Sequence, residues 1–289
     1  MKLLITGSNG MLGEALTSEC ASRGHDVIGL DLSDADVLVD FTDDAALSAA
    51  FNEVRPDVVI NCAAIVDVAL CDSDPLSAWK LNARAVGVLA EQCRRYNAQL
   101  VQVSTDHYFS GDGPELHDEK APVSFLNEYA RTKFAGEGFA LSGERSLVLR
   151  TNIIGFRGHG KPTFAEWAFD AVENDRTMTL FEDSFVSCID TASFSEALLD
   201  LTEKNAHGLF NVANHEVFSK QALIEEIAQV CGKLLTRASV GSVKQLGVRR
   251  ADSCGLDVSR AEEVLGYRLP SLGKAVMRLG KRRRSENAG

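Results

Sequence analysis

Short strands rich in apolar residues alternate with amphipathic helices through the first half of the chain. The predicted strands are Lys2–Thr6, His25–Asp31, Asp57–Asn61, Gln99–Ser104 and Ser146–Thr151, and the predicted helices are Met11–Arg23, Asp43–Val54, Leu76–Tyr96 and Tyr129–Leu141. Short strands of the buried type that are separated by amphipathic helices are typical of a parallel sheet covered on both faces. Because crossovers between parallel strands are nearly always right-handed, we expect an α/β fold with a doubly wound parallel sheet.

The alternation weakens after about Thr151, where the glycine-rich segment FRGHGKP occupies residues 156–162. Further helices are predicted at Thr163–Glu173, Thr191–Glu203, Ser219–Cys231 and Ser259–Leu265, and short strands at Met178–Phe181 and Leu209–Val212. We therefore expect a first domain over residues 1–151 and a smaller, ligand-binding lobe over residues 152–280, with segments that return to the first domain. Residues 281–289 are predicted to form a basic polar tail that is solvated and mobile.

A glycine-rich turn joins the first strand to the first helix. The segment GSNGMLG (7–13) follows the strand directly, so the spacing G-x-x-G-x-x-G stands in the strand–turn–helix context that dinucleotide sites require. Its glycines allow a tight turn, close approach of backbone N–H groups to a pyrophosphate, and close packing of helix on strand. The helix N-terminus adds a positive dipole end. We therefore predict a Rossmann-type NAD(P)-binding domain with cofactor contacts from Gly7, Asn9, Gly10, Met11, Leu12 and Gly13.

The second strand ends in Asp31, about 20 residues past the glycines. A carboxylate there can accept hydrogen bonds from the adenosine ribose and repels the additional phosphate of NADP, so Asp31 favours NADH over NADPH. Asp40 and Phe41 occupy a predicted adenine-contacting position, and the small residues of Cys62–Ala63–Ala64 leave space for a flat cofactor across the sheet. Capping by Asp31 and plain packing by the others are the alternative interpretations.

Three further residues indicate the chemistry. Tyr129 and Lys133 form a Y-x-x-x-K pair on one helix face, and Thr105 follows a neighbouring strand. A nearby ammonium favours the phenolate, which lowers the pKa of the tyrosine and suits it to general acid–base work on a carbonyl/alcohol pair. The threonine hydroxyl can polarise the same oxygen. Thr105, Tyr129 and Lys133 are therefore the predicted catalytic residues.

These motifs resemble the extended, nucleotide-sugar branch of the short-chain dehydrogenase/reductase superfamily, and within it the dTDP-4-dehydrorhamnose reductase family. The matching segments are GSNGMLG (7–13), INCAA (60–64), STD (104–106), NEYARTKFAGE (127–137), LRTN (149–152), GLFNV (208–212), SCGLD (253–257) and LGYRLP (265–270). The resemblance implies that Tyr129 donates a proton, Lys133 binds the cofactor ribose and tunes Tyr129, and Thr105 orients the keto group. It assigns Asn82 a supporting role at the cofactor site. The implied reaction is NAD(P)H-dependent reduction of the 4-keto group of a nucleotide-linked 6-deoxy-sugar, dTDP-4-dehydrorhamnose to dTDP-rhamnose.

The expected substrate contacts are Val66, Asp106, His107, Asn152 and Arg250, and the sequence departs from its relatives near some of them. His107 follows Thr105–Asp106, where sugar 4,6-dehydratases of the superfamily carry a glutamate, so water elimination is disfavoured. The R-P-x-x-S pattern of the family appears as RADS (250–253) without its proline. A nucleotide-sugar epimerase and a non-catalytic NAD(P)-binding regulatory subunit stay open as alternatives.

Composition limits the partners. The 289 residues hold 30 Lys+Arg against 41 Asp+Glu, a net charge of -11, which disfavours nucleic acid and anionic membranes as main partners. The chain has no apolar run long enough to cross a bilayer, and its seven cysteines form no C-x-x-C pair. We expect a cytoplasmic protein that binds no metal, takes a nucleotide sugar as substrate and could form a homodimer.

Overall fold

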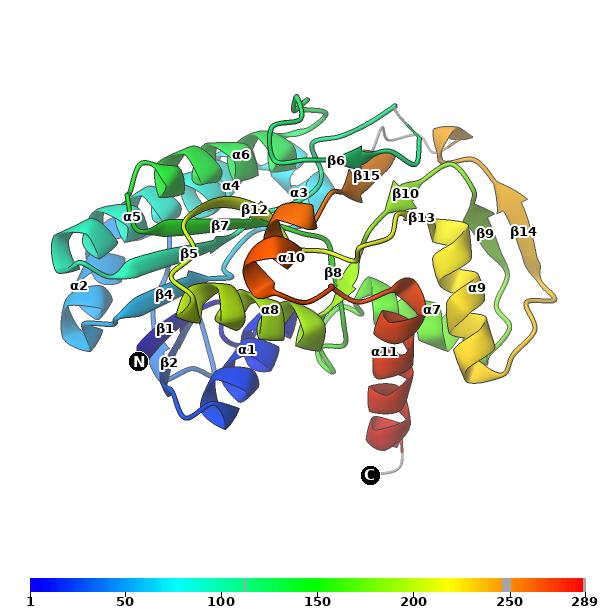
Figure 1. Cartoon of the computed structure of the whole chain (residues 1–289), viewed down its shortest axis with the longest axis horizontal. Coiled ribbons are helices and arrows are strands. Elements are labelled where there is room, and N and C mark those ends of the chain that lie inside the picture. The colour runs from blue at the N-terminus through cyan, green and yellow to red at the C-terminus, as the bar shows by residue number, and fades with distance from the viewer. Residues whose placement is uncertain (112, 246–250, 288–289) are drawn as a thin grey trace. The chain divides into compact units, whose positions relative to one another are not determined.

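The computed structural model describes residues 1–111, 113–245 and 251–287, which form two compact units (Figure 1). Unit 1 consists of Met1–Thr105, Phe125–Arg150 and Ser195–Phe210, and unit 2 of Asp106–Ser124, Thr151–Phe194 and Asn211–Gly289. Each unit is therefore assembled from three stretches of chain. Within the described residues, no helix combines the length and the apolar character needed to span a membrane.

Unit 1 contains a seven-stranded sheet with the order β12-β7-β5-β4-β1-β2-β3. The strands are β1 (Lys2–Thr6), β2 (Asp26–Asp31), β3 (Val37–Leu38), β4 (Val58–Asn61), β5 (Gln99–Val103), β7 (Ser146–Arg150) and β12 (Gly208–Asn211). The pairs from β3 across to β7 are all parallel, and β1 lies between β2 and β4, where the strand order reverses. The predicted doubly wound parallel sheet is confirmed. In sheets of this kind ligands bind beyond the carboxyl ends of the strands where the order reverses, which here are β1 and β4.

Helices cover both faces of this sheet (Figure 1). Helix α1 (Met11–Ser22) and α8 (Thr191–Glu203) lie on one face, and α2 (Asp44–Val54), α5 (Ala85–Tyr96) and α6 (Glu128–Leu141) on the other. Strands β4, β5 and β7 are buried along their whole length because helices pack on both sides of them.

The helix predicted over Leu76–Tyr96 is present without a break, but it contains a π-helical turn. Helix α3 (Val68–Ser73) and α4 (Pro75–Trp79) precede a π-helical turn, η1 (Lys80–Arg84), which leads into α5. Such a turn inserts one residue into the helix and changes which side chains share a face. Here it holds Asn82, whose side chain bonds to the backbone of Ile65 on the chain that follows β4.

Unit 2 is built on small sheets with the orders β13-β10-β15-β6, β11-β8 and β14-β9. Its strands are β6 (Leu116–His117), β8 (Ile153–Ile154), β9 (Met178–Phe181), β10 (Phe185–Val186), β11 (Ile189–Asp190), β13 (Phe218–Ser219), β14 (Ala238–Gly241) and β15 (Ser253–Leu256). Its helices are α7 (Phe164–Glu173), α9 (Lys220–Cys231), the 3-10 turn η2 (Val243–Gln245), α10 (Ser259–Leu265) and α11 (Leu272–Asn287). The two- to four-residue strands explain why few of them carry a periodic signal in the sequence.

The prediction of a mobile tail from residue 281 is wrong as far as Asn287, because α11 continues to that residue. Two arginines of α11 hold it on neighbouring elements. Arg278 Nη1 donates to Ser193 Oγ at 3.0 Å, and Arg283 pairs with Glu173 of α7 at 2.9 Å. The basic run therefore forms one end of a packed helix.

Candidate active site

The glycine-rich turn forms a cradle of backbone groups between β1 and α1. Gly7 has a φ of +68°, which glycine adopts without strain, and a Cβ on Gly13 would lie 2.1 Å from the Gly7 carbonyl oxygen. Gly10 precedes α1 as its N-cap and makes no side-chain capping bond there. A helix start without a capping side chain presents its first N–H groups to an anion. The cradle thus fits the pyrophosphate of a dinucleotide.

Asp31 lies beside this cradle at the end of β2. Its Oδ2 accepts from the backbone N–H of Asn9 at 2.9 Å, and its Oδ1 accepts from that of Leu32 at 2.7 Å. The carboxylate therefore holds the turn in shape as well as standing at the predicted ribose position.

The other predicted cofactor residues differ in what they offer. Asp40 accepts from the backbone and hydroxyl of Thr42, and the Thr42 N–H lowers the pKa of the Asp40 carboxyl below its ordinary value. Phe41 is buried and its side chain belongs to the hydrophobic core of the unit, which agrees with the packing interpretation of this residue. Burial raises the pKa of the Cys62 thiol to about 12, so this thiol stays protonated beside the cradle.

A buried polar ladder crosses the carboxyl ends of three strands, and sequence reasoning missed it. The Thr6 hydroxyl of β1 donates to Asn61 of β4, and Asn61 Nδ2 donates to Gln102 Oε1 of β5 at 2.7 Å. The Thr6 hydroxyl also accepts from the backbone N–H of Ala63 at 3.4 Å. The ladder fixes the strand ends below the cradle, because each polar atom needs its partner away from water.

Tyr129 and Lys133 share one face of α6 and are both buried, at 7% and 5% exposure. Lys133 Nζ donates to the carbonyl oxygen of Val103 at 2.7 Å, two residues before Thr105 on the chain leaving β5. Burial lowers the pKa of the Lys133 ammonium to about 8, against the opposing attraction of Glu137. The ring of Tyr129 packs with Cys71 of α3. The three predicted catalytic residues thus belong to one unit, on α6 and at the end of β5.

Asn82, in the π-helical turn, connects two parts of this site. Its Oδ1 accepts from the Ile65 N–H at 2.8 Å, and its Nδ2 donates to the Ile65 carbonyl at 3.0 Å and to Thr132 Oγ1 at 3.2 Å. Thr132 lies between Tyr129 and Lys133 on α6. Asn82 is itself buried, so its contact with the site runs through the backbone after β4 and through α6.

Sequence reasoning also missed a buried charged cluster behind Lys133. The carboxylate of Glu137 accepts from Ser104 Oγ at 2.6 Å, from Arg150 Nε at 3.0 Å and from Arg150 Nη2 at 2.8 Å. The sequence does contain an indication of this cluster: Glu137 stands four residues after Lys133, on the same helix face, and the charged Arg150 ends a buried strand.

The predicted substrate residues lie in both units. Val66 is exposed in unit 1, directly after Ile65. In unit 2, Asn152 Nδ2 donates to Asp106 Oδ2 at 2.7 Å, and the half-buried His107 follows Asp106 in the chain. Arg250 lies outside the described residues. In the described part of the chain, no group of three or more His, Cys, Asp or Glu side chains could hold a metal ion.

The chain is similar to known proteins in both sequence and fold. The sequence model of the family described as RmlD substrate binding domain matches residues 1–284. The chain is 35% identical to dTDP-4-dehydrorhamnose reductase of Mycobacterium tuberculosis, over 80% of this chain and 76% of that protein. It is 29% identical to the probable low-salt glycan biosynthesis reductase Agl14 of Haloferax volcanii, over 94% and 95% of the two chains. The crystal structure of dTDP-4-dehydrorhamnose reductase from Bacillus anthracis in complex with NADP has the same fold, with a TM-score of 0.88, 23% identity and coverage of 97% and 99%.

Proposed function

This chain belongs to the RmlD substrate binding domain family, and from that membership we propose that it reduces the 4-keto group of a nucleotide-linked 6-deoxy-sugar with NAD(P)H. The substrate that the relatives' names favour is dTDP-4-dehydrorhamnose, and the product is then dTDP-rhamnose.

The observation that carries the proposal is the anchoring of Lys133. Its ammonium is buried, bonds to the Val103 carbonyl at 2.7 Å, and has a pKa lowered to about 8. A cation held one helical turn from Tyr129 stabilises the phenolate that forms when the tyrosine gives up its proton. A surface Y-x-x-x-K pair would have neither the burial nor the fixed acceptor.

Each catalytic residue has a distinct task in the proposed reaction. When bound, the reduced nicotinamide supplies a hydride to the keto carbon. Tyr129 donates its proton to the oxygen as negative charge develops there, and Lys133 stabilises the tyrosinate that is left. The hydroxyl of Thr105 donates a hydrogen bond to the same oxygen and so fixes the direction of the carbonyl. Solvent then reprotonates Tyr129.

The cofactor residues would be those of the glycine cradle and the strand ends beside it. Gly7, Gly10 and Gly13 would let the backbone approach a pyrophosphate. A Cβ on Gly13 would collide with the carbonyl oxygen of Gly7 and with Ser8, so only glycine allows α1 to pack this closely on the turn. Asp31 would accept from the adenosine ribose, and its negative charge would disfavour the additional phosphate of NADPH. We therefore propose NADH as the preferred cofactor. Val66, Asp106, His107, Asn152 and Arg250 remain the proposed substrate contacts.

The deciding experiment supplies purified protein with dTDP-4-dehydrorhamnose and either NADH or NADPH, and follows loss of the reduced cofactor together with the sugar product. Stoichiometric formation of dTDP-rhamnose supports the proposal. Interconversion of a nucleotide sugar with its 4-epimer, without net cofactor oxidation, would identify an epimerase. Cofactor binding without turnover of any keto sugar would identify a regulatory subunit.

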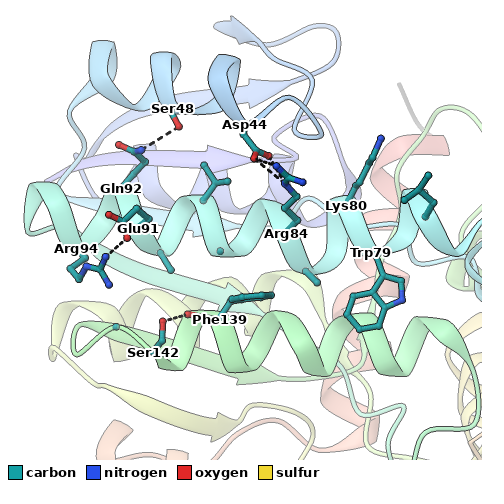
Figure 2. Close-up of a pocket in the computed structure, with 16 residues that line it drawn as sticks. Asp44, Ser48, Trp79, Lys80, Arg84, Glu91, Gln92, Arg94, Phe139 and Ser142 are labelled. Atoms are coloured by element: carbon teal, nitrogen blue, oxygen red, sulfur yellow. Dashed lines mark hydrogen bonds and ion pairs between the residues drawn. The ribbon is translucent and has the colours of Figure 1, made fainter.

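We also propose that the protein is a homodimer that uses the groove between α5 and α6. Figure 2 shows Trp79 and Phe139 facing this groove, which has a volume of about 830 Å³. Charged pairs flank it, among them Arg84 with Asp44 at 2.6 Å. A two-fold axis would bury the same apolar side chains of both copies, as isologous interfaces do.

The compartment we propose is the cytoplasm. All seven cysteines are free, and five of them are buried. Free thiols without disulfides are typical of a reducing compartment.

A further inference from the structure

The cluster of Ser104, Glu137 and Arg150 is almost completely removed from water. The side chains of Arg150 and Glu137 are 4% and 3% exposed, and the guanidinium bonds the carboxylate through two nitrogens, at 3.0 and 2.8 Å. A buried ion pair of this kind is a poor device for stability, because desolvating two charges costs about as much as their attraction returns. Its position one helical turn from the buried Lys133 therefore points to a role in the site.

The position of Glu137 supplies that role. Tyr129, Lys133 and Glu137 follow one another at intervals of four residues, so they line one face of α6. Two consecutive residues at the end of β5 bond to this face of α6: the Val103 carbonyl accepts from Lys133, and the Ser104 hydroxyl donates to Glu137. The next residue, Thr105, is the one proposed to polarise the keto group. The carboxylate thus ties α6 to β5 through Ser104 and to β7 through Arg150.

The cluster and Lys133 together contain two cations and one anion. Lys133 and Arg150 are cations and Glu137 is the anion between them, so the three together carry one positive charge. In the described part of the chain, the other titratable groups that act on Lys133 are Cys62 from the end of β4 and Cys71 from α3, both protonated thiols with raised pKa values. Glu137 is therefore the anion among these groups that holds the proton on Lys133.

We propose that Glu137 and Arg150 are positioning residues that set the charge state of Lys133 and hold it in register with Thr105. Glu137 favours the ammonium form, and Arg150 limits that effect by neutralising most of the carboxylate's field. Removing the charge of Glu137 should then lower the pKa of Lys133, and removing the charge of Arg150 should raise it. A pair with a purely structural role would not shift this pKa in opposite directions. The consequence for turnover rests on the proposed reductase function, but the effect on Lys133 does not.

The test is a titration of Lys133 in the full-length protein without substrate. Lysines are labelled with 13C, and the Lys133 resonance is identified by its loss in Lys133→Met. Glu137→Gln is expected to lower the pKa of Lys133 by about one unit, and Arg150→Met to raise it by about one unit. The double variant, with both charges removed, is expected to titrate close to the wild type. Shifts in the same direction, or no shift in either single variant, would overturn the proposal.

Conservative variants keep the test decisive where a neutralised variant does not fold. Arg150→Lys and Glu137→Asp retain the charges and disturb the two-nitrogen geometry. Both are expected to show a titration of Lys133 near that of the wild type. If Arg150→Lys or Glu137→Asp shifts the pKa of Lys133 as much as the neutralised variants do, packing and not charge is responsible, and the proposal is contradicted. Where the neutralised variants do not fold, a shift of about one unit in a conservative variant has the same meaning.

A second readout separates this inference from the proposed function. In the reductase assay, the alkaline limb of kcat/KM against pH should move in the same order as the Lys133 titration. If the variants turn over but the alkaline limb does not move in the same order as the pKa of Lys133, the proposed role of Glu137 and Arg150 is contradicted. The titration order without any turnover by the wild type contradicts the proposed function and leaves the role of the pair intact.

Discussion

The backbone of Asn82 occupies the space that a side chain at Gly136 would need. A Cβ on Gly136 would lie 2.4 Å from the carbonyl oxygen of Asn82, so α6 and the π-helical turn approach as closely as two backbones can. This contact places Asn82 where it bonds to both Ile65 and Thr132. The position of the Tyr129–Lys133 helix is therefore set by a missing side chain.

Replacing this glycine should separate the two helices. Gly136→Ala is expected to lower the free energy of unfolding by about 2 kcal/mol or more, since backbone cannot yield to the methyl group, and to reduce kcat. Gly138→Ala on the same helix is the matched control. A Cβ there meets nothing within 4 Å, so the higher helix propensity of alanine should stabilise the protein by up to about 1 kcal/mol. Equal effects of the two substitutions in urea denaturation would contradict the close approach.

Tyr129→Phe should abolish most of the proposed activity without loss of the fold. The variant keeps the ring that packs with Cys71 and loses the proton donor. We expect kcat to fall by about 10²–10⁴-fold while the Kd for the cofactor stays unchanged. Tyr96→Phe, at the end of α5, removes a hydroxyl elsewhere in the unit and should leave kcat as it is. Turnover of Tyr129→Phe at the wild-type rate would exclude the proposed mechanism.

Asp31 should control the choice between NADH and NADPH. Asp31→Ala removes both the charge and the acceptor for the Asn9 N–H, whereas Asp31→Asn removes only the charge. If repulsion of the additional phosphate sets the preference, both variants should raise the ratio of kcat/KM for NADPH to that for NADH by about 10-fold or more. A change in Asp31→Ala alone would assign the preference to the shape of the turn.

The buried ammonium of Lys133 should lower the free energy of unfolding. Its pKa is lowered from 10.5 to about 8, so the folded state binds fewer protons than the unfolded state between these pH values, and stability rises with pH across that window. At pH 7 the cost is up to about 3 kcal/mol. Lys133→Met should therefore be inactive yet more stable at pH 7, with its advantage shrinking as pH rises toward 10.5. Lys204→Met, at an exposed lysine, should change the free energy of unfolding by less than about 0.5 kcal/mol at any of these pH values.

The two tryptophans offer a matched test of the proposed dimer. Trp79 lies in the groove between α5 and α6, and Trp167 lies on α7, with exposed fractions of 42% and 43%. A glutamate at position 79 would bring two like charges into the interface, so Trp79→Glu should sediment as a monomer, while Trp167→Glu should behave as the wild type. A wild-type protein that sediments as a monomer at micromolar concentration, or a dimer that survives Trp79→Glu, would argue against this interface.

The sequence predicts those parts of the site that neighbouring residues define. The glycine cradle, the Tyr129–Lys133 pair and the strand ending before Thr105 are local patterns, and each is found on the element predicted for it. The parallel sheet follows from the burial of whole strands. These features depend on spacing along a few residues of chain, which a single sequence displays.

Features that depend on strand order could not be predicted in this way. The ladder of Thr6, Asn61 and Gln102 requires that β4 lie between β1 and β5, and nothing local to any of the three residues indicates it. The π-helical turn has no local signal either, and the side chain of Asn82 within it bonds to Ile65, which lies 17 residues earlier in the chain. The basic run at 281–284 was misinterpreted because its partner Glu173 is 110 residues away in the chain.

Because unit 1 is assembled from separate stretches of chain, its sheet cannot be completed until late in synthesis. Strand β12, at one edge of the seven-stranded sheet, comes from Gly208–Asn211, long after β7 ends at Arg150. A nascent chain that has emerged only as far as Arg150 therefore exposes the edge of β7, with its unpaired backbone groups, while the ribosome adds about sixty further residues. Truncation at the predicted boundary of 151 recreates that unfinished state permanently. Chaperone binding in vivo and self-association in vitro should concentrate on this one edge.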